Sequence, residues 1–326
     1  MRFARIVSLP LLMVTAASYL HASESEDTPW SILTEYVYMK RSKVTHTRFA
    51  RDLGNQGNTI LSSGNLVNQM GFESGARIGL TYTTDPKSSY QSRFMYIAPW
   101  TGSKERNGPG TFYYPFEVTR ANGDYFNADR VEATYSSQFY TLDLNYWRNS
   151  RGPGSAYFVV SGVFGLRFFH LQDKSTLAFT GSYSGALSKS NYDTKARNDV
   201  IGFQGGFNFQ MNPFLGFRFD LLALGGIGLN RAFGTDYMLD KNNSFVLKDH
   251  QMVNYQTVVF ADAEAKLGYQ IVKYFNMHIG YQLFYASGLA FSPAQYNYKN
   301  DFSYNNLYSH GHTYIQGLFV GMNFDF

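Results

Sequence analysis

The chain has 326 residues and a formal net charge of +4, with 29 Phe, 26 Tyr and 30 Gly but only 16% charged residues. This composition is unusual for a soluble domain and suits a membrane barrel with aromatic girdles. Without cysteine, the chain cannot form disulfides, a cysteine-ligated zinc site or an acylated lipoprotein anchor. The near balance of 28 basic and 24 acidic residues argues against a nucleic-acid-binding surface.

The first 22 residues read as a secretory signal peptide. Arg2 and Arg5 precede an apolar run, and small residues follow near Ala22. No later stretch approaches the roughly 20 apolar residues of a spanning helix. We therefore expect an exported protein with a short N-terminal segment, residues 23–29, and a β-barrel domain over residues 30–326, since a closed barrel is the other way to cross a membrane.

Alternation of apolar and polar residues with a period of two predicts ten strands. In the clearest, Gly71 to Thr83, the apolar Phe72 and Leu80 alternate with the charged Glu73 and Arg77. The ten lie at Trp30–Lys40, Gly71–Thr83, Tyr90–Tyr96, Tyr140–Tyr146, Phe158–Phe168, Ile201–Gln210, Leu215–Leu221, Val259–Tyr269, Phe275–Tyr285 and Gly311–Phe326.

The last predicted strand ends the sequence on Phe324 and Phe326, in alternation with Asn323 and Asp325. This ending is typical of the closing strand of an outer-membrane barrel. We expect Phe324 and Phe326 to act as the signal read by the barrel-assembly machinery.

The links between the predicted strands alternate in length. Short links fall at Asp85–Lys87, Asn149–Gly154, Met211–Pro213 and Val272–Lys273, and long ones at Arg41–Met70, Trp100–Arg130, Gln172–Lys195, Arg231–Gln251 and Gly288–Ser309. The pattern predicts an all-β, transmembrane, antiparallel up-and-down barrel of about 10 to 12 strands, with short periplasmic turns and long extracellular loops. Extra hairpins are candidates at Thr111–Val118 and Ser175–Ser182. A soluble β-sandwich is the alternative, but its loops would not alternate so regularly between short and long.

Several motifs occur in order along most of the chain: Phe72–Leu80, Gly165–Phe169, Asn198–Gly206, Leu267–Tyr269 with Ile279–Leu283, and Gln316–Gly321. Together they resemble the Legionella-type pore-forming outer-membrane proteins, and in part a related planctomycete group of barrels. The resemblance implies a pore-forming barrel of a Gram-negative outer membrane and carries over no catalytic residues.

Charged and polar residues on the inward-facing side of the predicted strands are candidates for the wall of a pore. They are Glu73, Arg77, Arg93, Asp143, Arg167, Gln204, Arg218, Asp220, Glu264 and Lys266, with Glu35 and Asp262 on the same face. They could line a hydrated channel or form salt bridges that brace a narrow barrel. Their near balance of charge argues against strong ion selectivity, and ten strands suggest a thin or blocked lumen.

Three functions are compatible with these patterns. The first is a small, weakly selective diffusion pore for solutes or ions, and the second is a non-conducting structural or adhesive barrel acting through its loops. A surface hydrolase is third, with Asp236, Asp240, Asp249 and His250 in one outer loop as its candidate groups. We expect no enzyme, no cofactor and no metal. The expected partners are outer-membrane lipid, the assembly machinery, small solutes or ions, and a second copy of the chain.

Two further motifs have partial features of chemical sites. Gly181–Gly185 has Tyr183 where a nucleophile elbow requires serine. His310 and His312 could share a metal on a strand, but no acidic pair or cysteine completes a ligand set, which favours a polar rim.

Overall fold

The computed structural model describes residues 29–42, 47–55, 57–85, 87–115, 125–150, 158–183, 186–212, 216–240, 242, 244–296 and 307–326. The predicted signal peptide and residues 23–28 lie outside this part of the chain. No described helix is long and apolar enough to cross a membrane.

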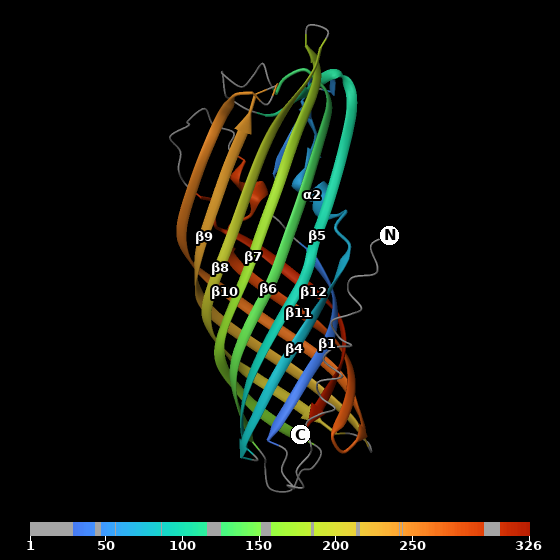
Figure 1. The fold of residues 1–326 in the computed structure, drawn as a ribbon, viewed down its shortest axis with the longest axis vertical. Coiled ribbons are helices and arrows are strands. Elements are labelled where there is room, and N and C mark those ends of the chain that lie inside the picture. The colour runs from blue at the N-terminus through green and yellow to red at the C-terminus, as the bar shows by residue number, and fades with distance from the viewer. Residues whose placement is uncertain are drawn as a thin grey trace.

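The described chain forms one antiparallel sheet whose ten long strands close into a ring (Figure 1). These strands are β1 (Trp30–Ser42), β4 (Phe72–Asp85), β5 (Ser88–Tyr113), β6 (Ala128–Ser150), β7 (Phe158–Tyr183), β8 (Ala186–Met211), β9 (Phe217–Leu239), β10 (Val246–Val272), β11 (Phe275–Leu289) and β12 (Gly311–Asp325). Each predicted strand corresponds to one of them, and the predicted fold class is confirmed.

The ring closes where β1 pairs with β12. Tyr36 lies opposite Val320. At the end of the seam, Trp30 and Phe326 exchange two backbone hydrogen bonds, with N···O distances of 3.2 and 2.9 Å. The ring of Phe324 lies 4.8 Å from that of Phe275 on β11. The C-terminal strand therefore closes the barrel as expected, while the role of its aromatic residues in assembly stays a prediction.

The register around the ring is staggered. The row of cross-strand partners that starts at Tyr36 reaches Tyr255 on β10 through β4 to β9. In the other direction, through β12 and β11, it reaches Leu267. These two ends lie twelve residues apart on β10, so the strands tilt steeply around a narrow interior.

An apolar belt covers the outer face of the lower barrel, with Phe203, Leu229 and Ile279 among its exposed side chains. Aromatic pairs border it on both sides, as expected for a membrane-spanning barrel. Towards the short turns these are Trp30–Tyr82, Tyr90–Tyr146 and Phe217–Tyr269, and towards the long connections Tyr38–Phe72 and Tyr285–Tyr314.

Strands β5 to β10 continue far beyond the belt. They contain 23 to 27 residues, against 13 to 15 in β1, β4, β11 and β12. A spanning strand needs only about 9 to 11. The excess forms the tall upper wall in Figure 1, which we call the extracellular extension.

Much of what the sequence predicted as long loops belongs to this extension. Thr111–Tyr113 lies in β5 and Ser175–Ser182 in β7, so neither adds the hairpin considered above, and residues 116–118 lie outside the described part. In the extension the alternation is inverted: Tyr135 and Leu177 are buried inside, while Thr134 and Thr176 face outward. The inversion hides these residues from a search for lipid-facing apolar stripes.

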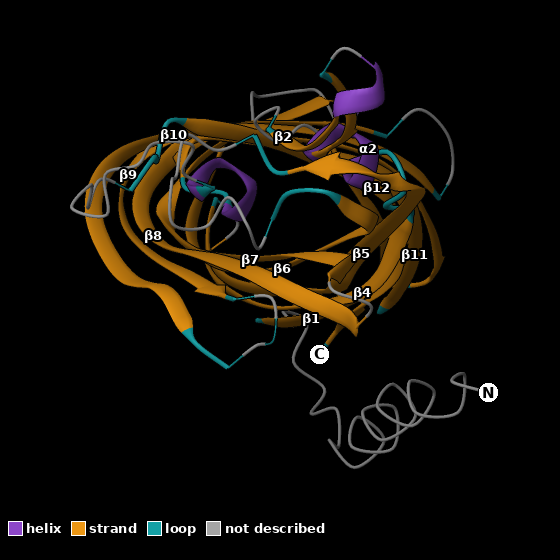
Figure 2. Cartoon of the chain, turned by 90° about the horizontal axis from the view of Figure 1, so that it is seen from above, coloured by secondary structure: helices purple, strands orange, loops and turns teal. Residues whose placement is uncertain are grey.

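The additional hairpin lies instead in the Arg41–Met70 link. It consists of β2 (Arg48–Asp52), η1 (Leu53–Asn55) and β3 (Asn58–Ser62), followed by α2 (Ser63–Val67). Viewed from above, these segments and η2 (Ser292–Gln295) lie over the wide mouth of the ring (Figure 2). Their apolar residues Phe49, Leu61 and Leu66 are fully buried, so they cover the side where the neighbouring strands are short.

The seam offers a test of the closing register. A Cβ atom added to Gly317 on β12 would lie 2.1 Å from the carbonyl oxygen of Tyr38, whereas one added to Gly225 on β9 would meet nothing within 4 Å. We expect Gly317→Ala to lower the free energy of unfolding by about 1–3 kcal/mol through overpacking. The matched Gly225→Ala should leave it unchanged or slightly raised. Urea unfolding in lipid vesicles measures both, and equal stability of the two variants would contradict this β1–β12 register.

Candidate functional site

A network of buried charges crosses the barrel interior at the level of the apolar belt. Three arginines meet four carboxylates and one imidazole, contributed by seven strands. The members are Glu35 on β1, Arg77 on β4, Arg93 on β5, Asp143 on β6, Arg167 on β7, Asp262 and Glu264 on β10, and His278 on β11. We call this set the charged layer.

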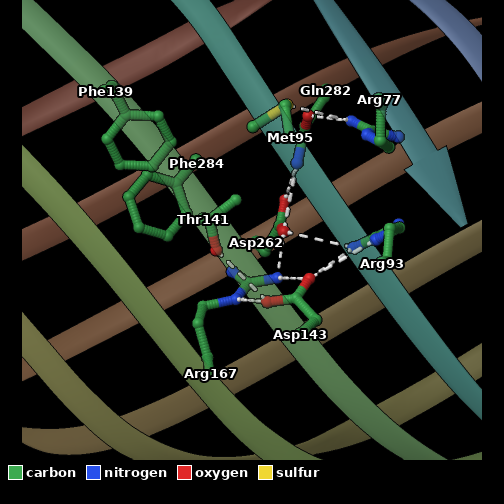
Figure 3. Close-up of a pocket in the computed structure, with 10 residues that line it drawn as sticks. All are labelled: Arg77, Arg93, Met95, Phe139, Thr141, Asp143, Arg167, Asp262, Gln282 and Phe284. Atoms are coloured by element: carbon green, nitrogen blue, oxygen red, sulfur yellow. Dashed lines mark hydrogen bonds and ion pairs between the residues drawn. The ribbon is translucent and has the colours of Figure 1, made fainter.

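Arg167 and Asp143 form the most enclosed part of the layer (Figure 3). Each is 1% exposed. Arg167 Nε and Nη2 donate to the two oxygens of Asp143 at 2.6 and 2.9 Å, and Nη2 also donates to Asp262 Oδ2 at 2.7 Å. The amide of Gln282 donates to both oxygens of Asp262, at 2.9 and 3.1 Å. One guanidinium thus joins β6 and β7 to β10 across the lumen.

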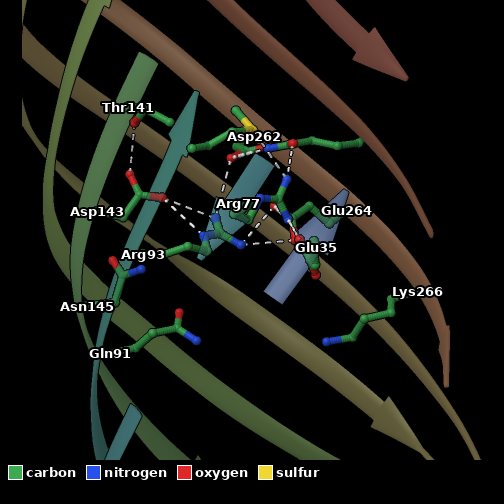
Figure 4. A network of polar contacts seen from close by, with 12 residues as sticks. Glu35, Arg77, Gln91, Arg93, Thr141, Asp143, Asn145, Asp262, Glu264 and Lys266 are labelled. Carbon is green, nitrogen blue, oxygen red and sulfur yellow. Dashed lines mark hydrogen bonds and ion pairs between the residues drawn. The ribbon is translucent and has the colours of Figure 1, made fainter. Parts of the chain in front are cut away.

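Arg93 extends the layer towards β5 (Figure 4). It donates to Asp143 Oδ2 at 3.1 Å and to both oxygens of Glu264 at 2.9 and 3.1 Å. Arg77 Nη1 lies 2.7 Å from Glu35 Oε2 and 3.4 Å from Glu264 Oε1. A guanidinium can bridge several carboxylates in this way, because its five N–H donors can reach carboxylates on different strands.

The layer continues to β11 and β12. His278 Nε2 lies 2.7 Å from Glu35 Oε1. Arg77 also donates to the Gln282 amide oxygen, and its guanidinium carbon lies 5.0 Å from the ring centre of Phe319. Every charged group in the layer therefore has a partner, as a buried charge requires.

An aromatic layer lies next to the charges. It consists of four buried rings, Phe139, Phe169, Phe260 and Phe284, whose centres are 5.4 to 6.1 Å apart. Arg167 packs 5.4 Å from the centre of Phe284. Between the two layers lies a cavity of about 10 Å³, space for about one water molecule. In the described part of the chain, side chains thus fill the lumen at this level.

The interior near the short turns contains polar groups that are partly exposed to solvent. Asp220 accepts from Arg218 Nε at 2.8 Å and lies 3.8 Å from Lys266 Nζ, and the side chain of Arg218 is 47% exposed. Gln204 donates to Asn145 at 2.7 Å. An apolar cluster of Leu222, Leu224, Val163 and Trp147 shares this region. The polar groups form the periplasmic mouth of a closed interior.

Inside the extracellular extension, Arg41 joins β1 to β7. It donates to Asp173 Oδ1 at 2.6 Å and also to Ser137, while the Tyr135 hydroxyl donates to Asp173 Oδ2 at 2.6 Å. Burial raises the pKa of the Tyr135 hydroxyl well above its usual value. Above this group, Tyr192 and Tyr296 pack edge to face with their ring centres 4.8 Å apart. The extension is thus a packed structure with its own core.

All ten predicted pore-lining residues lie on the inner face of the barrel. Arg77, Arg93, Asp143, Arg167 and Glu264 meet in the charged layer, and Gln204, Arg218, Asp220 and Lys266 lie nearer the periplasmic mouth. Glu73 is half-buried on β4, beyond the charged layer. Whether these residues line a conducting path stays a prediction.

The aromatic layer is what the sequence interpretation missed. Three of the four rings belong to pairs of adjacent aromatic residues: Phe139–Tyr140, Phe168–Phe169 and Phe284–Tyr285. In a strand, neighbours face opposite sides, so one member of every such pair must point into the lumen. That signal was present in the sequence.

The candidate hydrolase residues do not form one site. Asp236 is buried on the inner face beside Lys248, and burial raises the pKa of its carboxyl. Asp240 accepts a hydrogen bond from the backbone N–H of Ser244 at 2.7 Å and so stabilises the turn between β9 and β10. Asp249 faces outward, opposite Tyr237, while His250 lies on the inner face. His250 is the direct cross-strand partner of Asp236, so these two residues lie together on the inner face, while Asp240 and Asp249 lie apart from them.

The two rim histidines are both exposed. His310 precedes β12 and lies 3.4 Å from the amide nitrogen of Gln256, and His312 is on β12. Among the described residues, no group of three or more His, Cys, Asp and Glu side chains is arranged to hold a metal ion. Of the Gly181–Gly185 motif, residues 184 and 185 lie outside the described part.

The sequence matches no protein-family model and no curated protein. Its fold is similar to that of the outer-membrane protease OmpT of Escherichia coli, with 10% identity over 94% of this chain and 100% of that one, at a TM-score of 0.47. LpxR of Salmonella typhimurium has 10% identity over 91% and 100% of the chains, at 0.27. Ail of Yersinia pestis has 9% identity over 91% and 98%, at 0.25.

The charged layer predicts that replacing Arg167 destabilises the protein much more than replacing Arg218. Arg167→Met would leave Asp143 and Asp262 short of their buried partner, and breaking such a pair costs about 3–5 kcal/mol. Arg218→Met removes an ion pair whose arginine is half exposed. We expect it to lower the free energy of unfolding by less than about 1 kcal/mol. Guanidinium unfolding of both variants in vesicles measures the difference. Equal losses would mean that the layer is hydrated and not closed.

Proposed function

We propose that the protein is a closed outer-membrane barrel that acts at the cell surface through its extracellular extension, and not by diffusion through its lumen. The observation that supports this most directly is the pair of stacked layers, one charged and one aromatic, which leave space for about one water molecule between them. A diffusion pore needs a continuous hydrated path, and small barrels of eight strands have interiors that side chains just fill.

The extension supports a role at the surface. Six strands extend beyond the length that a membrane requires, and their inner face carries a core that includes Trp100, Tyr125 and Phe179. Such a rigid wall can hold its tips in fixed positions. Phe126 and Phe245 are exposed next to the ends of β6 and β10, and Leu53 is exposed on η1 of the additional hairpin, so all three are available to contact a partner. No catalytic step is part of the proposal.

The pore expected from the family resemblance is the second candidate. It is favoured by the polar periplasmic mouth around Asp220 and Lys266. For a solute to pass, the contacts of Arg93 and Arg167 with β6 and β10 would have to open together. The two candidates differ in conductance and share one fold.

Planar-bilayer recording separates them. We expect the refolded wild-type protein to show no discrete conductance steps. A triple variant, Arg93→Ser, Asp143→Ser and Phe284→Ala, removes one cation, one anion and one ring, and should show small openings because both layers lose volume without a change in net charge. Heat-modifiable gel mobility confirms that each protein is folded. Regular steps in the wild-type protein, with an amplitude that changes in the variant, would refute the closed barrel and support the pore.

The surface role has its own test. A laboratory strain that displays the wild-type barrel should be retained on protein-coated surfaces. Retention should fall at least about fivefold with Leu53→Ser, Phe126→Ser and Phe245→Ser combined, because exposed apolar area contributes about 25 cal/mol per Å² when it is buried in a contact. A matched triple, Lys104→Gln, Arg106→Gln and Lys189→Gln, alters three cations elsewhere in the same extension. Failure of the wild-type strain to be retained, or equal retention of both triples, would count against an adhesive role.

A further inference from the structure

Four cations gather on the outer wall of the extracellular extension, immediately above the apolar belt. They are Lys174 on β7, Lys195 and Arg197 on β8, and Arg231 on β9, and we call them the basic patch. In the cross-strand register, the row that contains Arg231 follows directly on the outward row of Phe168, Ile201 and Leu229, which belongs to the belt. The patch therefore begins where the acyl chains of the outer leaflet end.

Among the described residues, three of the four cations of the patch form no ion pair. Lys174 and Lys195 are direct cross-strand partners, an arrangement that destabilises a sheet when nothing neutralises the charges. Within the described chain, no ion pair or hydrogen bond involves the side chain of either lysine or that of Arg231. Positive potential is thus concentrated on one part of the wall.

The acidic residues nearest the patch on the outer face, Asp193 and Asp199, are already engaged. Asp193, two residues before Lys195 on β8, accepts a hydrogen bond from the Thr176 hydroxyl. Asp199 lies 2.8 Å from Arg197 Nε and 2.6 Å from His170 Nδ1. The imidazole of His170 in turn stacks on Tyr140, with 4.7 Å between the ring centres. Asp199 is also the direct cross-strand partner of Arg231. Among the described residues, neither Asp193 nor Asp199 forms an ion pair with Lys174, Lys195 or Arg231.

The cluster of positive charge is confined to β7, β8 and β9. On the same outer rows, β6 presents Ser136 and Gln138, and β10 presents Gln251. Next to Arg231, the side chain of Tyr255 on β10 is 72% exposed, and Val253 beside it is also exposed. Cations thus lie beside apolar side chains above a lipid-facing surface, which suits an amphiphilic anion.

We propose that the basic patch binds the phosphate groups of a phosphorylated glycolipid of the outer leaflet, whose acyl chains lie along Ile201 and Leu229 below it. Lysine and arginine recognise phosphate through charge-assisted hydrogen bonds, and Arg can bind it with two donors at once. A lipid supplies both parts of the match, because its head group reaches the height of the patch while its chains contact the belt. This site lies outside the lumen and is independent of the function proposed above.

The test compares two triple variants of the full-length protein refolded in neutral detergent micelles. Lys174→Gln, Lys195→Gln and Arg231→Gln together remove the three cations that form no ion pair. The control is the Lys104→Gln, Arg106→Gln, Lys189→Gln triple, which loses the same charge at positions of the extension outside the patch. The probe is a bisphosphorylated lipid A, and its binding is measured by native mass spectrometry and by titration at two salt concentrations. Unfolding midpoints establish that both variants are folded.

We expect the patch triple to bind the probe about 100-fold more weakly than the wild type, from the roughly fivefold contribution of each basic residue near a charged lipid surface. The control triple should bind like the wild type, and lipid A without phosphates should bind weakly to all three proteins. Equal affinity of the two triples would overturn the proposal. So would equally tight binding of inorganic phosphate, because the site would then recognise a soluble anion and not a lipid.

Discussion

The structure depends on one constraint: within a bilayer, every backbone N–H and C=O must find a partner inside the protein. The pairing of β1 with β12 meets this requirement, because it leaves the ten-stranded ring without a free edge at membrane level. Ten strands with a stagger of twelve residues then set the tilt of the wall and the width of the interior. The lumen is narrow for this reason, before any of its side chains is considered.

In a narrow lumen, charged side chains are stable only when they are paired. Charged side chains that meet there lose much of their water, so each must find an opposite charge or a hydrogen-bonding partner. Arg77, Arg93 and Arg167 meet this need because a guanidinium can bind carboxylates on two strands at once. The result is a set of links between opposite walls that closes the passage, and the rings of Phe139 and Phe284 fill the space beside it.

The outer wall changes character where the membrane ends. In the belt, apolar side chains face lipid and polar ones face inward, whereas in the extension the same strands bury Tyr135 and Leu177 and expose Thr134 and Lys174. A continuous strand such as β7 therefore has its apolar face outward where it meets lipid and inward where it meets water. The lower part anchors the protein, and the upper part forms a folded body with its own core. The basic patch lies at the boundary between them, where the charged head groups of lipids are found.

The sequence alone determined the fold class, the ten long strands, the closing strand and the inward positions of the charged residues. All of these follow from a local period of two, which depends only on near neighbours in the chain. Strand ends beyond the membrane were not predictable in the same way, because in the extension the pattern is inverted and outward residues such as Thr176 resemble loop residues. Only the tertiary structure decided which charges meet: Arg167 and Asp262 are 95 residues apart, and the stagger of the ring brings them together. The same long-range register decided that Phe139 and Phe284 stack beside them and that Lys174 and Lys195 lie opposite each other, since contact across a barrel depends on strand number, tilt and register, and not on any local pattern.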